Sequence, residues 1–256
     1  MASVSREFQV FVKPVGARCN LHCSYCYYLE KHGVGRAVPG SRMSDEMLER
    51  YIRQHIEAST EPEIFFSWHG GEPAVAGLDF FRKAVTIEEA YMPEGSTVRN
   101  GIQTNGTLIN DEWGRFLGRE NFYVGLSIDG PERYHNINRT RVDGSGTFRE
   151  AMRGLEILKQ YNVPHEFLCV VSNDNVDNPL EIYRFFRELG AQYITFLPLV
   201  EEDGRGSGRA TPQSVRPLEF GKFLEVIFDE WIEKDIGRVK VQIFEEALRT
   251  AFRQEH

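Results

Sequence analysis

Hydrophobic residues follow two alternating periodicities along the chain. Six short runs rich in β-branched and aromatic residues predict β-strands, and the segments between them carry apolar residues at helical spacing. The strands are predicted at residues 8–15, 63–69, 98–104, 122–128, 163–171 and 192–199. Helices are predicted at residues 44–58, 78–91, 147–161 and 178–190, with a further short helix after Asn110.

Several of these helices begin at recognisable start signals. Ser44 and Asn110 are predicted to be N-cap residues. Thr147 and Glu150 have the spacing of a capping box. The pair Asn178–Pro179 combines a capping residue with proline at the first helical position. These signals fix where the predicted helices start.

Alternating strands and helices of this length predict an α/β fold with a parallel sheet. Right-handed crossovers then allow either an open, doubly wound sheet or a barrel, whole or partial. Residues 201–209 are polar and rich in glycine, which favours a mobile loop or lid. Aromatic and aliphatic residues then recur at helical spacing over residues 220–232. We expect that helix to pack on the core, with a cofactor or partner groove as the alternative.

Composition excludes several classes of protein. The chain has 256 residues, of which 41% are hydrophobic, enough for a substantial core. Its formal net charge of −8 argues against nucleic acid or an anionic membrane as the main partner, since both attract cationic surfaces. The first residues lack an apolar run of signal-peptide length, and no run approaches a membrane span. We therefore expect a cytoplasmic protein.

Three of the four cysteines are clustered. Cys19, Cys23 and Cys26 follow the first predicted strand, where a parallel fold places its ligands, whereas Cys169 lies inside a predicted strand as a small core residue. Three thiolates are one ligand short of a structural zinc site or of a fully ligated 4Fe–4S cluster. A 4Fe–4S cluster with one iron open to a ligand fits best; zinc and unligated thiols are the alternatives.

Further candidate residues follow the later strands. In the run His69–Pro73, the two glycines allow close approach of a ligand, and backbone carbonyls with Glu72 could receive an ammonium group. A tight turn closed by proline is the alternative. After the fourth strand, Ser127 offers a hydroxyl and Arg139 a cation for a carboxylate; a turn residue and a surface cation are the alternatives.

The cysteine run resembles the cluster loop of the radical S-adenosylmethionine superfamily. The stretch 13–31 and four later motifs are similar to the anaerobic sulfatase-maturating enzymes of that superfamily. The later motifs are residues 68–73, 101–108, 125–131 and 196–200. The resemblance implies a partial (β/α)6 TIM-like barrel, one 4Fe–4S cluster on Cys19, Cys23 and Cys26, and S-adenosylmethionine on its open iron.

The resemblance also implies an activity. Members oxidise a Cys or Ser of a sulfatase polypeptide to Cα-formylglycine through a 5′-deoxyadenosyl radical, with electrons from a flavodoxin or a ferredoxin. It places Tyr28 and His69 near the substrate. Residues that would contact the cofactor are Tyr25, Gly71, Glu72, Ser127, Arg139 and Val200.

The resemblance extends to about Phe252, after which family members continue into a cysteine-rich domain with two auxiliary clusters and the catalytic base. We therefore expect a core barrel over residues 1–200, a loop and helices completing it over residues 201–256, and no auxiliary-cluster domain. The catalytic base would then be missing. Two alternatives are another radical peptide-modifying maturase and a truncated, non-catalytic iron–sulfur or peptide-binding module.

Overall fold

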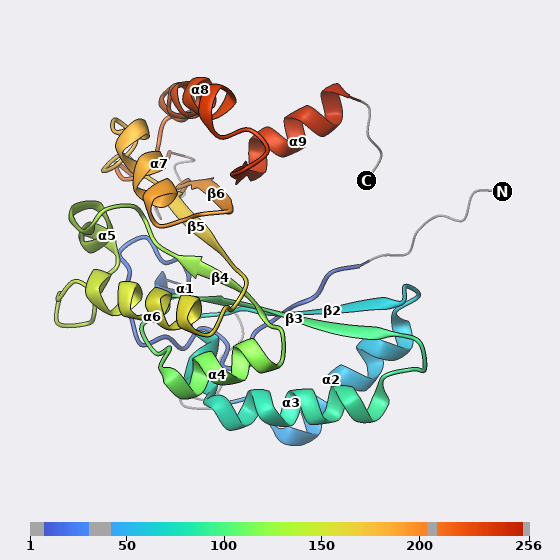
Figure 1. Ribbon diagram of the computed structural model, residues 1–256. Coiled ribbons are helices and arrows are strands. Elements are labelled where there is room, and N and C mark those ends of the chain that lie inside the picture. Colours follow the sequence, from blue (N-terminus) through green and yellow to red (C-terminus); the bar gives the residue numbers. More distant parts are fainter. Residues whose placement is uncertain (1–7, 31–41, 204–208, 253–256) are drawn as a thin grey trace. The chain divides into compact units, whose positions relative to one another are not determined.

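A computed structural model describes residues 8–30, 42–203 and 209–252 (Figure 1). Strands and helices alternate along these segments, as the sequence predicts. The strands are β1 Phe11–Val12, β2 Glu63–Trp68, β3 Thr97–Thr104, β4 Tyr123–Ser127, β5 His165–Val171, β6 Tyr193–Pro198 and β7 Lys240–Val241. The helices are α1 Tyr27–Glu30, α2 Asp45–Ala58, α3 Leu78–Tyr91, α4 Asp111–Arg119, α5 Glu132–Asn138, α6 Phe148–Gln160, α7 Pro179–Glu188, α8 Pro217–Lys234 and α9 Gln242–Ala251, with a 3-10 turn η1 at Pro73–Ala76.

The strands form one sheet in the order of the sequence, from β1 to β7. Parallel registers pair β1 with β2, β2 with β3, β5 with β6, and β6 with β7. This order gives an open parallel sheet with β1 and β7 at its edges, and not a closed barrel. The α/β prediction is confirmed.

The chain divides into two compact units. The first comprises residues 1–20, 28–124 and 153–164, and the second comprises residues 21–27, 125–152 and 165–256. The division predicted at residue 200 stays a prediction. No helix in the described part of the chain is long and apolar enough to cross a membrane.

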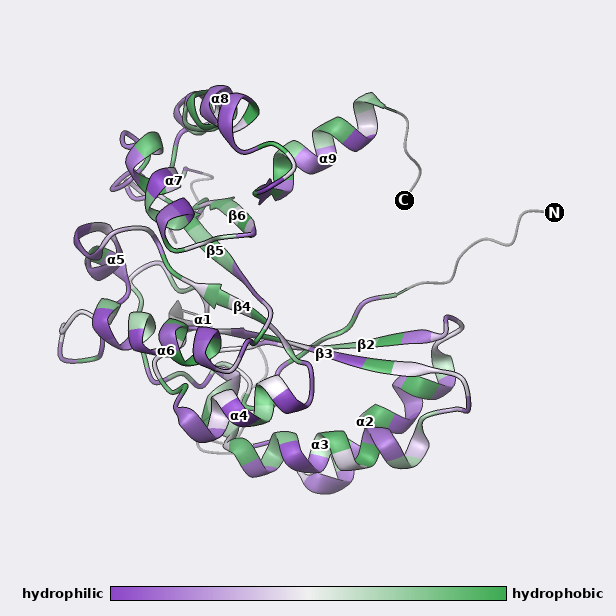
Figure 2. Cartoon of the chain, in the orientation of Figure 1, coloured by the Kyte–Doolittle hydropathy of each residue, from purple (hydrophilic) through white to green (hydrophobic). Residues whose placement is uncertain are grey.

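In the first unit, β2 supplies the centre of the core. Alternate residues Ile64, Phe66 and Trp68 are at most 2% exposed. The indole of Trp68 lies edge-on to Phe80 and Phe81 of α3, at centroid distances of 5.8 and 5.7 Å. Hydrophobic residues recur along α2, α3 and α4 between hydrophilic ones, as expected for helices with one buried face (Figure 2).

In the second unit, a line of phenylalanine rings joins the sheet to its helices. The ring of Phe186 on α7 lies 5.2 Å from that of Phe167 on β5 and 6.3 Å from that of Phe196 on β6. Phe196 in turn lies 5.3 Å from Phe223 of α8. The predicted packing of this helix on the core is therefore confirmed. Cys169 is fully buried in β5, as predicted.

The predicted helix starts are largely reproduced. The side chains of Ser44 and Asn110 accept hydrogen bonds from the backbone N–H groups of Met47 and Trp113. Pro179 begins α7, although the side chain of its N-cap residue Asn178 makes no capping hydrogen bond. The first strand is shorter than predicted, because the backbone turns at Lys13 and the N–H of Gly16 donates to its carbonyl.

A buried carboxyl group on α3 should make stability depend on pH. Glu88 is 3% exposed; its Oε2 accepts a hydrogen bond from Asn100 at 2.7 Å, and Oε1 has no partner among the described residues. Burial raises its pKa to about 7. The folded state then holds the proton more tightly than the unfolded state. The stability it contributes is fully present below pH 4.5 and is lost as the pH rises through 7.

We expect Glu88→Gln to remove this dependence. At pH 8 the variant should be more stable than the native chain by up to about 3 kcal/mol, from a pKa difference of roughly 2.5 units. Denaturant unfolding between pH 5 and pH 8 measures the effect. Glu94→Gln, at an exposed position, is the control and should keep the native pH profile. If the free energy of unfolding changes equally with pH in the native chain and in Glu88→Gln, the pH dependence does not come from Glu88.

Candidate functional site

In the first unit, the run His69–Pro73 packs directly on the segment that leads to Cys19. The N–H groups of Gly71 and Glu72 donate to the carbonyls of Gly16 and Arg18, both at 2.9 Å. Gly70 adopts a φ of +122°, which a residue with a side chain rarely adopts. A Cβ on Gly71 would lie 2.3 Å from the carbonyl oxygen of Arg18. Two backbone segments therefore meet here with no room for a side chain.

The Glu72 carboxylate joins this turn to the end of β3. It is 1% exposed, and its Oε1 accepts hydrogen bonds from the N–H of Ala74 and the hydroxyl of Thr104, at 2.9 and 2.8 Å. Oε2 accepts from the N–H of Asn105 at 2.7 Å. Burial raises the pKa of Glu72, and these hydrogen bonds oppose that rise. The carboxylate therefore links this turn to the end of β3 through its hydrogen bonds. The sequence did not show that its oxygens would be used in this way.

Asn105 continues the connection to the first cysteine. Its amide nitrogen lies 3.0 Å from the Oδ1 of Asn20 and 3.8 Å from the Sγ of Cys19. Its Oδ1 accepts from the N–H and the hydroxyl of Thr107. The end of β3 thus positions the Cys19 side chain through an amide that sequence reasoning noted only as part of a strand end.

Both predicted substrate contacts lie in the first unit, close to Lys13. The Lys13 ammonium is 4.8 Å from the ring centroid of Tyr28. His69 is hydrogen bonded to Ser67 at 3.0 Å and stands edge-on to Phe11. Burial and the Lys13 charge lower the pKa of His69, so the imidazole is neutral at pH 7. A neutral histidine, an aromatic ring and a cation therefore share one region.

In the second unit, the segment with Cys23 and Cys26 is held by backbone hydrogen bonds. The N–H groups of His22 and Ser24 donate to the carbonyls of Thr140 and Asn138, at 2.7 and 2.9 Å. The N–H of Cys26 donates to the carbonyl of Cys23, which closes a turn. Burial raises the pKa of Cys23 to about 11, and the positive charge of the nearby Arg139 opposes part of that rise.

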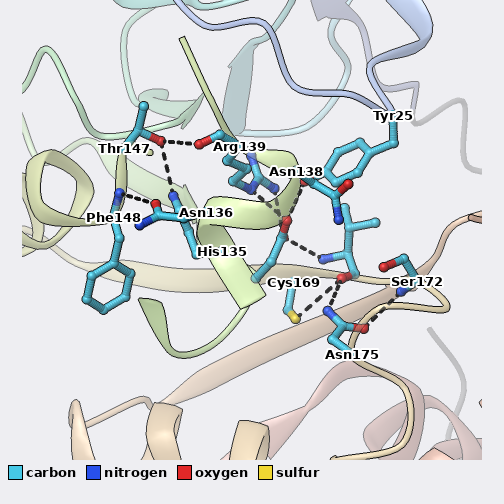
Figure 3. A network of polar contacts seen from close by, with 12 residues as sticks. Tyr25, His135, Asn136, Asn138, Arg139, Thr147, Phe148, Cys169, Ser172 and Asn175 are labelled. Carbon is cyan, nitrogen blue, oxygen red and sulfur yellow. Dashed lines mark hydrogen bonds and ion pairs between the residues drawn. The ribbon is translucent and has the colours of Figure 1, made fainter. Parts of the chain in front are cut away.

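The carboxylate of Asp129, which follows β4, belongs to a polar network of the second unit that includes Tyr25 and Arg139, both labelled in Figure 3. It accepts hydrogen bonds from the hydroxyl of Tyr25 at 2.5 Å and from the Nη2 of Arg139 at 3.0 Å. It also accepts from the N–H of Val170 on β5 at 3.0 Å. The guanidinium of Arg139 in turn lies 5.6 Å from the Tyr25 ring centroid. Two predicted cofactor residues, Tyr25 and Arg139, are thus brought together by an aspartate that sequence reasoning passed over.

The remaining predicted cofactor residues lie at strand ends of the second unit. Ser127 ends β4 and is 9% exposed. Val200 follows β6 and is 73% exposed. A buried hydroxyl and an exposed aliphatic side chain offer different contacts, and their cofactor roles stay predictions.

The chemistry of the thiols fits an iron–sulfur cluster. Among the described residues none of the four cysteines forms a disulfide, and Cys19, Cys23 and Cys26 are partly exposed. Within the described residues, no three or more His, Cys, Asp or Glu side chains converge as a single metal ion requires. A 4Fe–4S cluster binds each thiolate through a different iron, so it does not need such convergence. The chemistry of the three thiols therefore suits the ligation of such a cluster.

Comparison with known proteins identifies the family. A model of the radical SAM superfamily matches residues 14–186. The chain belongs to the radical SAM superfamily. Members of this superfamily use a 4Fe–4S cluster and S-adenosylmethionine, so the predicted family and its cofactors are confirmed.

Individual relatives extend the similarity along nearly the whole radical SAM chain. It is 42% identical to a serine-type anaerobic sulfatase-maturating enzyme of Bacteroides thetaiotaomicron, over 96% of this chain and 63% of that enzyme. It is 34% identical to a cysteine-type enzyme of Clostridium perfringens, over 94% of this chain and 65% of that enzyme. Native anSMEcpe with bound AdoMet and Cp18Cys peptide superposes with a TM-score of 0.83 at 34% identity, over 95% of this chain and 65% of that one. The chain thus spans less than two thirds of each of these relatives.

Proposed function

We propose that this chain cleaves S-adenosylmethionine reductively and serves in the oxidation of a Cys or Ser of a sulfatase to Cα-formylglycine. The observation that carries the proposal is the turn at Gly71, which packs without side-chain space on the segment that leads to Cys19. The similarity to anaerobic sulfatase-maturating enzymes, one of them with AdoMet and a peptide bound, supports it.

In this proposal, each residue has a role that its surroundings support. Cys19, Cys23 and Cys26 would hold the cluster. The cluster and S-adenosylmethionine, when bound, would supply the radical chemistry that oxidises the target residue. The remaining cofactor contacts would come from Tyr25, the backbone of Gly71, Ser127, Arg139 and Val200, whereas Glu72 would act differently from what the resemblance implies. Because both Glu72 oxygens already accept hydrogen bonds, we assign that residue to holding the turn in place.

The substrate and the partners belong to the same proposal. Tyr28 and His69 would lie beside the target peptide; His69 is neutral at pH 7 and would neither attract nor repel an ionic group there. A flavodoxin or a ferredoxin would supply the electron. We propose a cytoplasmic location, because reduced cysteines and a low-potential cluster require a reducing compartment.

Product analysis tests the function. The protein is reconstituted with iron and sulfide without oxygen, reduced, and given S-adenosylmethionine with a Cys-type or a Ser-type sulfatase peptide. We expect chromatography to detect 5′-deoxyadenosine. We also expect mass spectrometry to show the decrease in peptide mass that accompanies oxidation of the Cys or Ser to formylglycine. If no 5′-deoxyadenosine forms, the proposal is wrong. If it forms while both peptides stay unchanged, sulfatase oxidation by this chain is rejected in favour of another peptide target.

Arg139→Ala should weaken the binding of S-adenosylmethionine about tenfold or more. A charge-assisted hydrogen bond to a carboxylate contributes roughly 1.5–3 kcal/mol, which corresponds to that change in affinity. Equilibrium binding to the reconstituted protein measures it. Arg184→Ala is the matched control, because Arg184 pairs with Glu230 and should leave the affinity unchanged. An unchanged dissociation constant for Arg139→Ala would rule out its contact with the cofactor.

A further inference from the structure

Asp129 combines deep burial with contacts to three separate segments of the second unit. It is 2% exposed, and its donors come from the cysteine loop, from the residue after α5 and from β5. An ionised carboxylate at such a depth is costly unless it is paired and hydrogen bonded. Asp129 meets that condition through Tyr25, Arg139 and Val170.

We propose that Asp129 is a positioning residue that fixes Arg139 for the carboxylate of S-adenosylmethionine and couples it to the cysteine loop through Tyr25. This inference rests on the proposed function, in which Arg139 contacts the cofactor. Tyr25 directly precedes Cys26, so one carboxylate holds both the proposed cofactor cation and the neighbour of a cluster ligand.

The donor count of arginine supports this role. A guanidinium has five N–H donors. The Nη2 of Arg139 donates to Oδ1 of Asp129, and Nε lies 3.0 Å from Oδ2 without an aligned hydrogen bond among the described residues. Asp129 therefore engages the Nε–Nη2 edge of the guanidinium. A carboxylate ligand matches that planar arrangement.

The backbone of Arg139 is fixed independently of this contact. Its N–H donates to the carbonyl of His135 at 2.9 Å, and its own carbonyl accepts from the hydroxyl of Thr147 at 2.8 Å. Thr147 directly precedes α6, and its predicted capping box with Glu150 stays a prediction. Because these contacts locate the main chain, loss of the Asp129 charge should alter the direction of the side chain more than the position of the residue.

A second buried aspartate with tyrosine and arginine donors offers a control within the same unit. Asp235 is fully buried and accepts hydrogen bonds from the hydroxyl of Tyr183 and from the guanidinium groups of Arg187 and Arg238. It resembles Asp129 in burial and in donor types, but it lies between α8 and β7. Substituting either aspartate removes a buried charge with tyrosine and arginine partners, so the comparison separates a general structural cost from an effect on the cofactor.

The test is a double-mutant cycle on cofactor affinity. S-adenosylmethionine dissociation constants are measured for the reconstituted native chain, Asp129→Asn, Arg139→Ala and the double variant. We expect about a tenfold weaker affinity for Asp129→Asn alone, and no further loss when it is added to Arg139→Ala. Asp235→Asn should lower the unfolding temperature while keeping the native affinity.

Arg139→Lys keeps the charge but loses the planar geometry, and it applies even if Asp129→Asn does not fold. We expect it to weaken affinity about as much as Asp129→Asn, because lysine cannot engage both carboxylates in one plane. Native affinity in Arg139→Lys, or additive losses in the double variant, would overturn the positioning role. Native affinity in Arg139→Ala would instead reject the cofactor assignment itself, so the two failures are distinguishable.

Discussion

Replacing Cys19, Cys23 and Cys26 together by alanine should abolish the iron–sulfur cluster. Three thiolates are the ligands that the family loop offers, and about four irons are expected in one 4Fe–4S centre on the native chain. After anaerobic reconstitution, iron analysis and visible absorbance should show the cluster in the native chain and none in the triple variant. Without the cluster, no 5′-deoxyadenosine should form.

Cys169→Ala is the matched control for this prediction. Its thiol is fully buried in β5, whereas Cys19, Cys23 and Cys26 are partly exposed, so it is not expected to ligate iron. The variant should keep a native amount of iron and lose about 1 kcal/mol of stability from the small cavity. Cluster absorbance that survives in the triple variant, or disappears in Cys169→Ala, would show that the ligands are assigned wrongly.

Gly71→Ala should disrupt the proposed cofactor site from its backbone. The added Cβ would lie 2.3 and 2.5 Å from the carbonyl oxygens of Arg18 and Ala17. Both are main-chain atoms, so one of the two backbone segments must shift. That shift would disturb the hydrogen bond from the N–H of Glu72 to the carbonyl of Arg18. We expect the free energy of unfolding to fall by about 3 kcal/mol or more. S-adenosylmethionine cleavage should fall to background.

Gly221→Ala provides the control for a glycine that is not constrained. It lies on α8, and an added Cβ would meet no heavy atom within 4 Å. Alanine has the higher helix propensity, so this variant should gain up to about 1 kcal/mol of stability with full activity. Denaturant unfolding of both variants gives the comparison. A Gly71→Ala protein of native stability and activity would show that the turn tolerates a side chain.

Local chemistry explains which elements the sequence predicts well. The sequence predicted the bounds of α3 correctly, and the side chains of Ser44 and Asn110 cap the helices that they were expected to cap. These signals act within one turn of helix, so they are readable from neighbouring residues. The edge strand β7 has two residues, which is too short for any periodicity. The first strand ends early at a turn in which Gly16 adopts a positive φ. The periodicity of hydrophobic residues does not reveal such a backbone conformation.

The candidate site is predictable where a motif names its residues and unpredictable where a contact is made at long range. The cysteines, Gly71 and Arg139 stand in recognisable runs. Asp129 and Asn105 stand in similar runs, but their importance comes from partners that are distant in the sequence, such as Tyr25, 104 residues away. The position of Asp129 directly after a predicted strand was the available signal. Periodicity does not show what an acidic residue at such a position contacts.

The hydrogen bonds that Glu72 accepts bear on how iron enters and leaves the protein. Small metal-dependent domains are unfolded until their ion binds. In the first unit here, hydrogen bonds between protein atoms alone shape the segment at residues 16–18 and hold the amide beside Cys19. The Cys19 side of the ligand loop is therefore shaped by protein contacts that do not involve iron. We expect this part of the loop to keep its conformation when oxygen removes the iron, so cluster repair should not require refolding of the first unit.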